Sequence, residues 1–158
     1  MRGARGGQPA KVRLRRAVDT DVPALAALGR AAYAHYVPRI GHEPAPMTAD
    51  YAAAVAAGEV WVAEHDDRVV GLVVLVPAVD HLLLENVAVN PDLQGAGVGT
   101  ALLRLAEREA ASRSLPAIRL YTNEAMTENL AYYPRRGYRE THRAIENGFR
   151  RVYFEKRL

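Results

Sequence analysis

A glycine-rich turn carries the strongest chemical signal in this sequence. It reads Gln-Gly-Ala-Gly-Val-Gly over residues 94–99, and it follows an apolar run at 82–89 that Asn90-Pro91-Asp92 brings to an end. Directly after the turn, apolar residues recur at helical spacing. The first amides of a helix have no partner within the helix, and the helix dipole adds roughly +0.5 charge at that end. Because glycines let an anion approach the backbone without an intervening Cβ, we expect this turn to bind a phosphate or pyrophosphate.

The common nucleotide-binding motifs do not account for the turn. A P-loop would continue with Gly-Lys-Ser/Thr, which does not follow here. The dinucleotide motif G-x-G-x-x-G would need its last glycine at Thr100 or Leu102, depending on the glycine from which the count starts. A glycine-rich connection without a ligand is the alternative interpretation.

The turn and the strand before it resemble the signature of the GNAT superfamily of N-acetyltransferases. The family pattern Q/R-x-x-G-x-G/A is matched by Gln94, Gly97 and Gly99, behind a V-A-V-x-P sequence at 87–91. A second family pattern, N-x-x-x-Y-x-x-x-G-F/Y, is matched downstream at 129–138. The two segments stand in the family's order, which strengthens the resemblance.

The resemblance covers roughly residues 12 to 158 and implies an enzyme that moves an acetyl group from acetyl-CoA directly to a primary amine. The acceptor would be a small molecule or a peptide, with no covalent enzyme intermediate and no metal. In the family, the turn holds the pyrophosphate, the preceding strand pairs with the pantetheine arm like an added strand, and an asparagine and a tyrosine contact the donor. Carried over to this sequence, the expected cofactor-binding residues are Val87, Ala88, Val89, Gln94, Gly95, Ala96, Gly97, Val98, Gly99, Thr100, Asn129 and Tyr133.

The resemblance also implies two residues for proton transfer. Glu85 is the acidic exception in the apolar strand, where many relatives place a glutamate that takes the proton of the amine, and burial would raise its pKa toward a useful range. Tyr133 resembles the tyrosine proposed to protonate the leaving thiolate. The alternatives are a structural or solvent-facing glutamate and an aromatic ring packed on a helix face. Asn86, beside Glu85, is predicted to occupy a β-bulge.

In the family, the first helix–loop–helix region covers the acceptor and varies with the substrate. The candidates for acceptor contacts here are Tyr33, Tyr36 and Met47, together with Asn123 at the end of a later strand. Packing within the fold is the alternative for the aromatic side chains on helices. His42, in the loop of this region, is expected to be solvated.

Hydrophobic periodicity and turn residues predict the elements that position these groups. We expect helices from residue 22 to about 36, over 48–57, over 98–112 and over 126–136. Asp19–Asp21 should cap the first helix, Pro38 should end it, and Pro134 should kink the last. The expected strands are 11–18, 59–64, 68–76, 82–89, 117–122, 138–143 and 149–156.

A strand, a helix and a strand in succession over 82–122 imply a right-handed parallel crossover. The fold class is therefore α/β with a mixed sheet. We expect a mostly antiparallel central sheet with one parallel pair, flanked by about four helices, as in the GNAT-like acyl-CoA N-acyltransferase fold.

Length and composition bound the remaining possibilities. The chain has 158 residues, 49% of them apolar and 25% charged, which suits a mobile basic tail at 1–10 and a single acetyltransferase domain at 11–158. No apolar run approaches the ~18 residues of a membrane span, and no signal peptide is evident, so we expect a cytoplasmic protein without membrane partners. The net charge is +3, but no nucleic-acid recognition motif accompanies it, so no nucleic-acid partner is expected.

Other functions stay open at this point. The protein could be a transferase that prefers another acyl-CoA, which competition between donors would distinguish from an acetyltransferase. It could also be a non-catalytic acyl-CoA-binding or sensing module, which a turnover assay would distinguish from an enzyme. A nucleic-acid-binding domain is the remote alternative, and it would require salt-dependent binding of oligonucleotides. A homodimer is expected by analogy with relatives that associate through sheet edges or the C-terminal hairpin.

Overall fold

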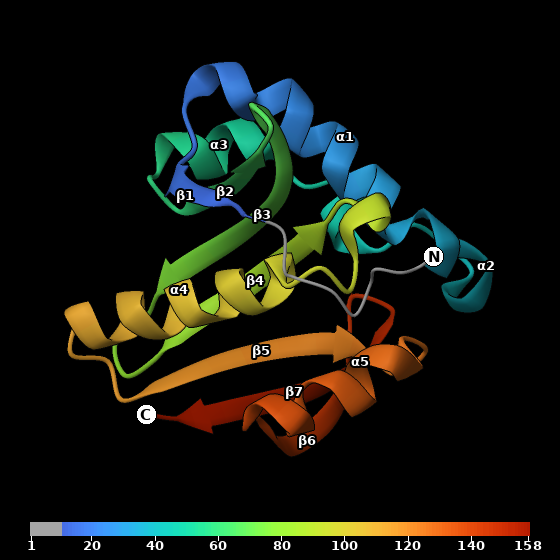
Figure 1. The fold of residues 1–158 in the computed structure, drawn as a ribbon. Helices are drawn as coiled ribbons and strands as arrows, with labels where there is room; N and C mark the ends of the chain where they lie inside the picture. Colours follow the sequence, from blue (N-terminus) through green and yellow to red (C-terminus); the bar gives the residue numbers. More distant parts are fainter. Residues whose placement is uncertain (1–10) are drawn as a thin grey trace.

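A seven-stranded mixed sheet organises the chain in the computed structural model, which describes residues 11–158 (Figure 1). The strand order is β1-β2-β3-β4-β5-β7-β6. The strands are β1 (Arg13–Arg16), β2 (Val60–His65), β3 (Arg68–Pro77), β4 (Leu82–Val89), β5 (Ala117–Asn123), β6 (Arg139–Glu146) and β7 (Phe149–Arg157). The helices are α1 (Val22–Tyr33), α2 (Val37–Ile40), α3 (Tyr51–Ala56), α4 (Val98–Ser112) and α5 (Thr127–Tyr132).

The strands β4 and β5 form the one parallel pair of this sheet, and they separate early. They pair only where Leu82 lies opposite Ile118 and Leu83 opposite Arg119. Beyond that point the two strands run in the same direction and diverge toward their carboxyl ends (Figure 1). All other neighbouring strands are antiparallel. The predicted fold class, a mixed α/β sheet with one parallel pair and flanking helices, is confirmed.

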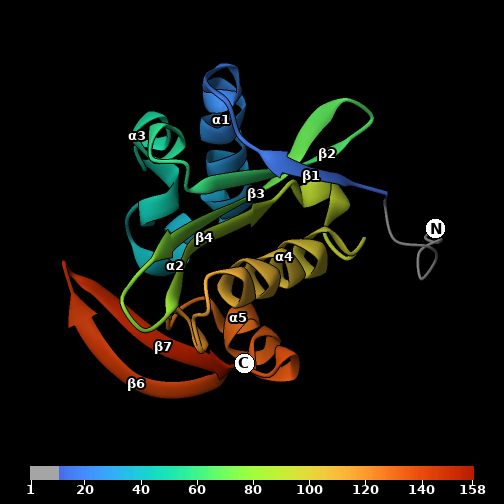
Figure 2. The same ribbon diagram turned by 90° about the vertical axis from the view of Figure 1, so that its left-hand side faces the viewer.

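Helices cover both faces of the sheet. Figure 2 shows α1 and α3 on one face, and α4 and α5 on the other. One buried cluster joins α4 to the sheet through Leu102, Leu105 and Phe154, among others. The other joins α1 and α3 to the sheet through Leu25, Tyr51 and Leu72, among others. The opening between the diverging ends of β4 and β5 is called the fork below. It has a different helix layer on each side.

A β-bulge lies in the middle of β4. Val74 of β3 lies opposite Asn86, whereas the next residue, Leu75, lies opposite Leu84, so Glu85 has no partner in the ladder. An extra residue shifts the in–out alternation by one. Leu84 and Val87 consequently both pack in the α4 cluster. The bulge residue is Glu85, and the prediction that placed Asn86 in the bulge is wrong.

Several predicted boundaries also need correction. The first helix ends at Tyr33, and Pro38 lies in the first turn of α2, where a missing N–H costs little. The first strand is limited to Arg13–Arg16. The second predicted helix starts only at Tyr51, because Asp50 accepts a hydrogen bond from the Ala53 amide at 3.0 Å and caps it there.

The last predicted helix is divided. It runs over Thr127–Tyr132 and continues as a single 3-10 turn at Pro134–Arg136, because Pro134 has no N–H for the helical ladder. Gly137 closes it with φ of +91°. The turn between β6 and β7 is Asn147–Gly148, with φ of +53° and +80°, as predicted for this hairpin.

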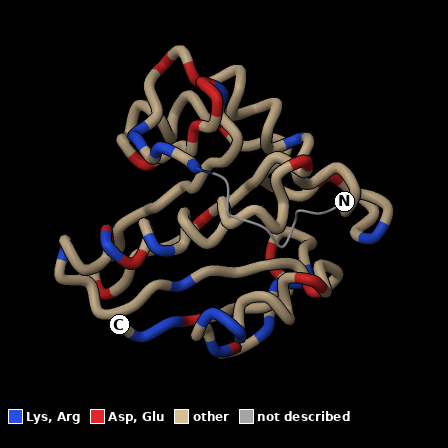
Figure 3. Tube along the Cα trace, viewed as in Figure 1, with Lys and Arg blue, Asp and Glu red and all other residues tan. Residues whose placement is uncertain are grey.

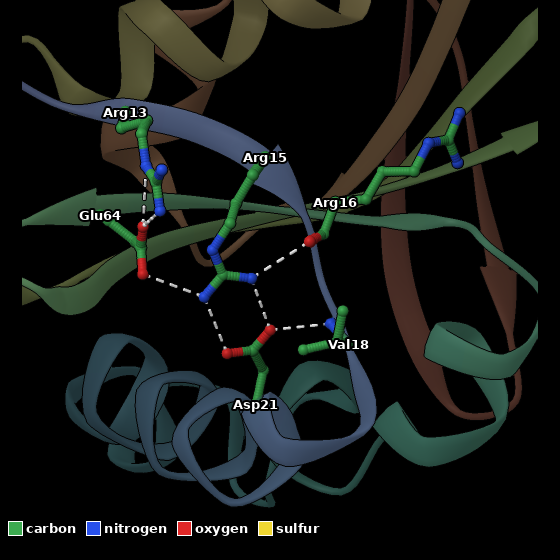
Figure 4. A network of polar contacts seen from close by, with 6 residues as sticks. All are labelled: Arg13, Arg15, Arg16, Val18, Asp21 and Glu64. Atoms are coloured by element: carbon green, nitrogen blue, oxygen red, sulfur yellow. Dashed lines mark hydrogen bonds and ion pairs between the residues drawn. The ribbon is translucent and has the colours of Figure 1, made fainter.

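A network of charged side chains ties β1 to β2 and to the start of α1 (Figure 4). Arg15 donates to both carboxylate oxygens of Asp21, at 2.8 and 3.0 Å, and to Glu64 at 3.0 Å. Asp21 also accepts from the Val18 amide at 2.8 Å. Asp21 stands at the N-cap of α1, but its side chain makes no bond to the helix, so the predicted capping contact is replaced by these bonds.

We expect Asp21→Asn to lower the free energy of unfolding by about 1–3 kcal/mol at pH 7, since it removes the charge from a buried, charge-assisted contact. The hydrogen bonds from Arg15 hold the pKa of Asp21 below its usual value, so the stabilisation is present above about pH 4 and decreases as the pH falls through the lowered pKa. Urea denaturation of both proteins at pH 7 and near pH 3 measures this.

The matched control is Asp19→Asn in the same turn, which leaves the Arg15 contacts in place and should change the stability little. A difference between wild type and Asp21→Asn that is equally large at both pH values would contradict the assignment.

Basic and acidic residues are mixed along the described chain. Figure 3 shows blue and red segments near one another in several parts of the trace, separated by longer uncharged stretches. Among residues 11–158, no helix is both long enough and apolar enough to cross a bilayer. The basic tail expected at 1–10 lies outside the described residues.

Candidate functional site

The glycine-rich turn leaves the carboxyl end of β4 and leads into α4. Gly95 and Gly97 adopt φ of +84° and +90°, a left-handed conformation that other residues reach only with strain. Within residues 11–158, no main-chain or side-chain acceptor is found for a set of amides that lie in or next to this turn. These are the amides of Gly95, Gly97, Val98, Gly99 and Thr100. The first regular hydrogen bond of the helix runs from the Ala101 amide to the Gly97 carbonyl. The turn thus presents free donors at the positive end of a helix.

Tyr132, which was not predicted as a site residue, borders the glycine-rich turn. A Cβ on Gly99 would stand 3.1 Å from the Tyr132 hydroxyl, so the glycine permits close packing of α5 against the start of α4. The Arg136 guanidinium lies 3.6 Å from the centre of the Tyr132 ring. Such a stack orients the cation and adds positive charge near the free amides.

A cavity of about 680 Å³ occupies the fork between β4 and β5. One wall comes from 84–87 of β4 and the other from 120–123 of β5. Small residues of α3 and of the loop before it form a third wall, and Asn129 and Tyr133 reach it from the α5 region. The cavity therefore combines segments that are far apart in the sequence.

Six of the predicted site residues meet here, and none of residues 94–100 of the glycine-rich turn is among them. The lining includes the predicted residues Tyr33, Glu85, Val87, Asn123, Asn129 and Tyr133. Tyr36 and Met47 are buried and do not line the cavity, so the structure does not bring these two candidates to it. Ala88 is buried in the cluster beneath α1, and Val89 packs against the α4 cluster.

Tyr133 is almost fully buried, with its ring in an aromatic cluster. It lies edge-on to Tyr132 at 5.3 Å and to Tyr138 at 5.6 Å between ring centres. Burial raises the pKa of the Tyr133 phenol, so the hydroxyl stays protonated at neutral pH. No hydrogen bond from the hydroxyl to another of the described residues is found, and the residue lines the cavity, so the hydroxyl is free to donate to a molecule there.

Glu85 lies on the cavity wall with an exposed side chain. The bulge lifts it out of the regular alternation of the strand, so the burial that would raise its pKa is not found. Its neighbour Asn86 is the buried polar residue of β4. Glu59 and Asp50 also line the cavity and were not predicted, since nothing in the local sequence places them near β4.

Hydrogen bonds hold the β4 wall in place. The Tyr33 hydroxyl donates to the Val87 carbonyl at 2.7 Å, and Asn86 donates to the Tyr51 hydroxyl at 2.9 Å. Tyr51 in turn donates to the Pro46 carbonyl at 2.7 Å. A Cβ on Gly29 would come within 2.5 Å of the Tyr51 hydroxyl, so this approach requires glycine. Burial raises the pKa values of Tyr33 and Tyr51.

The opposite wall is fixed by local bonds. Asn129 donates to the Thr122 hydroxyl at 3.0 Å, which attaches α5 to the end of β5. Asn123 accepts from the Ala125 amide at 2.9 Å, which turns the chain toward α5. Among residues 11–158, no group of three or more His, Cys, Asp or Glu side chains is arranged to hold a metal ion.

The chain is similar in sequence to known proteins. The sequence matches the Acetyltransferase (GNAT) family over residues 26–138. The uncharacterized protein YxbD of Bacillus subtilis (strain 168) is 34% identical over 74 residues, which are 47% of this chain and only 45% of YxbD. The chain thus spans less than half the length of that relative.

Solved structures share the fold. The PaiA N-acetyltransferase of Thermoplasma acidophilum, in complex with coenzyme A, has a TM-score of 0.79 at 15% identity, over 94% of this chain and 99% of its own. A GNAT family acetyltransferase of Elizabethkingia anophelis, with acetyl-CoA bound, has a TM-score of 0.70 at 19% identity, over 93% and 98%. Because the family match runs from α1 through the glycine-rich turn and α5, the chain belongs to the GNAT acetyltransferase family.

Proposed function

We propose that this protein transfers an acetyl group from acetyl-CoA directly to a primary amine of a small-molecule or peptide acceptor. The observation that carries the proposal is the fork between β4 and β5. It places the free amides of the glycine-rich turn at the end of one strand and encloses a cavity lined by Glu85 and Tyr133. Membership of the GNAT family supports the same reaction type.

The turn suits a donor that carries a pyrophosphate. Free amides at a helix N-terminus bind phosphate oxygens, and Arg136 adds a cation nearby. Two proteins with this fold were crystallised with coenzyme A or acetyl-CoA, which favours that donor. The unpaired edge of β4 beyond Leu83 offers main-chain groups to an extended arm, as a strand partner would.

In the proposed reaction, a new C–N bond forms at the thioester carbonyl as the C–S bond breaks. Glu85 takes the proton that the amine loses, directly or through a water molecule. The Tyr133 hydroxyl gives a proton or a hydrogen bond to the departing sulfur. Both side chains line the same cavity, where the amine and the thioester would meet. No step requires a covalent enzyme intermediate.

Calorimetric titration with acetyl-CoA, with NAD and ATP as controls, tests the donor assignment. Selective binding of acetyl-CoA supports the proposal, and turnover with an amine panel then separates an enzyme from a non-catalytic acyl-CoA sensor. Competition with other acyl-CoA thioesters separates an acetyltransferase from a relative with another donor. Folded protein that does not bind acetyl-CoA would contradict the proposed function.

We expect Glu85→Gln to lower kcat/KM for the amine by about 10- to 100-fold, with the largest effect at low pH. The reason is that most of the amine is protonated there and needs a base. The affinity for acetyl-CoA should stay within about twofold, because Glu85 lies apart from the turn. Initial rates between pH 6 and 9 and a calorimetric titration measure both quantities.

The comparison variant is Glu59→Gln, which removes another carboxylate from the same cavity. If Glu59→Gln shows the pH-dependent loss and Glu85→Gln does not, the base is Glu59, and the role proposed for Glu85 is wrong.

A further inference from the structure

The lining of the cavity includes a cation that the proposed reaction does not use. Of the described residues that line the cavity, Arg151 is the one Lys or Arg. It lies on β7 opposite Asn123, at the carboxyl end of β5. The acidic side chains of the lining, Glu85 and Glu59 among them, come from other elements.

Aromatic rings hold the Arg151 guanidinium in place. It lies 4.2 Å from the centre of the Tyr121 ring and 5.7 Å from that of Phe149. The His42 ring, from the loop before α3, stacks on the Phe149 ring, with 4.6 Å between the ring centres. The Arg151 side chain is only 14% exposed. A guanidinium fixed between rings loses little freedom when it binds an anion, so this is a preorganised position.

The Arg151 guanidinium uses only part of its hydrogen-bonding capacity within the described residues. Its Nη1 atom donates to Glu146 at 3.2 Å, and this is its one hydrogen bond within the described residues. Glu146 is 49% exposed at the end of β6, and an exposed ion pair of this kind contributes little. The remaining N–H groups of Arg151 are therefore free for the paired hydrogen bonds that a guanidinium makes with a carboxylate.

Part of the cavity lining is apolar and made of small residues. Ala49, Ala53, Ala54 and Ala57 line it together with Pro44 and Pro46. Such a wall leaves room for the apolar body of a ligand. The cavity thus offers carboxylates for an ammonium group, a cation for an anion, and apolar surface for the rest of a ligand.

We infer that the acceptor is an amino acid or a similar amine that carries a carboxylate, and that Arg151 binds this carboxylate while the amine faces Glu85. The inference rests on the proposed acetyl transfer and narrows its acceptor class. Arg151 acts as a specificity-determining residue. It takes no part in the proton transfers or in binding the donor.

Paired acceptors that differ by one carboxylate test the inference. Suitable pairs are phenylalanine with phenethylamine, methionine with 3-(methylthio)propylamine, and 5-aminovalerate with butylamine. Initial rates with saturating acetyl-CoA give kcat/KM for each member. We expect at least one pair in which the acid exceeds its partner by about 10- to 100-fold, as a charge-assisted pair of hydrogen bonds would produce.

Variants assign that preference to Arg151. Arg151→Gln should lower kcat/KM for the acid by the same factor, mainly through KM, and leave the decarboxylated amine within about twofold. Arg151→Lys should retain part of the preference, because it keeps the charge without the planar fork. The matched control, Arg150→Gln, alters the neighbouring arginine of β7, which is 67% exposed and does not line the cavity, and it should change neither rate.

The outcomes separate this inference from the proposed function. If amines are acetylated but no acid is, if acid and amine react equally, or if the preference survives Arg151→Gln in a folded protein, the carboxylate subsite is wrong while acetyl transfer stands. If calorimetry shows no binding of acetyl-CoA, the proposed function is wrong, and the inference falls with it.

Discussion

Gly97→Glu is expected to lower the affinity for acetyl-CoA at least about 100-fold. Gly97 adopts φ of +90° and immediately precedes the free amides of Val98, Gly99 and Thr100. A side chain there strains the backbone of the turn, and a carboxylate repels the pyrophosphate and competes for the same donors. Calorimetric titration with acetyl-CoA measures the loss.

A matched control exists at the end of α2. Gly41 adopts φ of +92°, and a Cβ there would meet no atom within 4 Å. Gly41→Glu therefore introduces similar backbone strain and the same charge outside the glycine-rich turn. Both variants should lose roughly 1–2 kcal/mol of stability, but only Gly97→Glu should lose acetyl-CoA binding. Equal affinities in the two variants would mean that the turn does not hold the donor.

Tyr133→Phe is expected to lower kcat by about 10- to 100-fold, with KM for the acceptor nearly unchanged. Phenylalanine keeps the ring contacts with Tyr132, Tyr138 and Phe154 and removes only the hydroxyl that faces the cavity. The free energy of unfolding should change by less than about 1 kcal/mol, because that hydroxyl has no hydrogen-bond partner within the described residues. Steady-state rates and thermal unfolding measure the two effects.

The control for this variant lies in the same aromatic cluster. The Tyr138 hydroxyl is buried and has no hydrogen-bond partner among residues 11–158, and burial raises the pKa of Tyr138 as it does that of Tyr133. Tyr138 does not line the cavity. Tyr138→Phe should therefore leave kcat unchanged and preserve or raise the stability. If Tyr133→Phe is as active as Tyr138→Phe, the role of Tyr133 is packing alone.

The raised pKa of Tyr133 predicts how kcat should depend on pH. The phenol stays protonated through the neutral and mildly alkaline range, so its titration should not reduce the rate below about pH 10. A fall in kcat between pH 8 and 9 that disappears in Tyr133→Phe would contradict this.

The sequence by itself determined the strand–turn–helix at the centre of the molecule. The strand at Leu82–Val89 and the helix at Val98–Ser112 have the predicted limits. Positive φ values at Gly95 and Gly97 follow from residues that tolerate them. The hairpin turn at Asn147–Gly148 belongs to the same class. These features depend on neighbours along the chain, so local periodicity and turn chemistry suffice to predict them.

Only the tertiary structure decided which side chains share the cavity. The bulge that exposes Glu85 and buries Asn86 follows from the register between β3 and β4, and one residue of slip exchanges their environments. Arg151 enters the cavity because β7 pairs with β5, and Tyr51 meets Asn86 across a separation of 35 residues. Tyr36 and Met47 are buried, but outside the cavity lining. Such contacts depend on the joint arrangement of distant elements, and no local pattern encodes them.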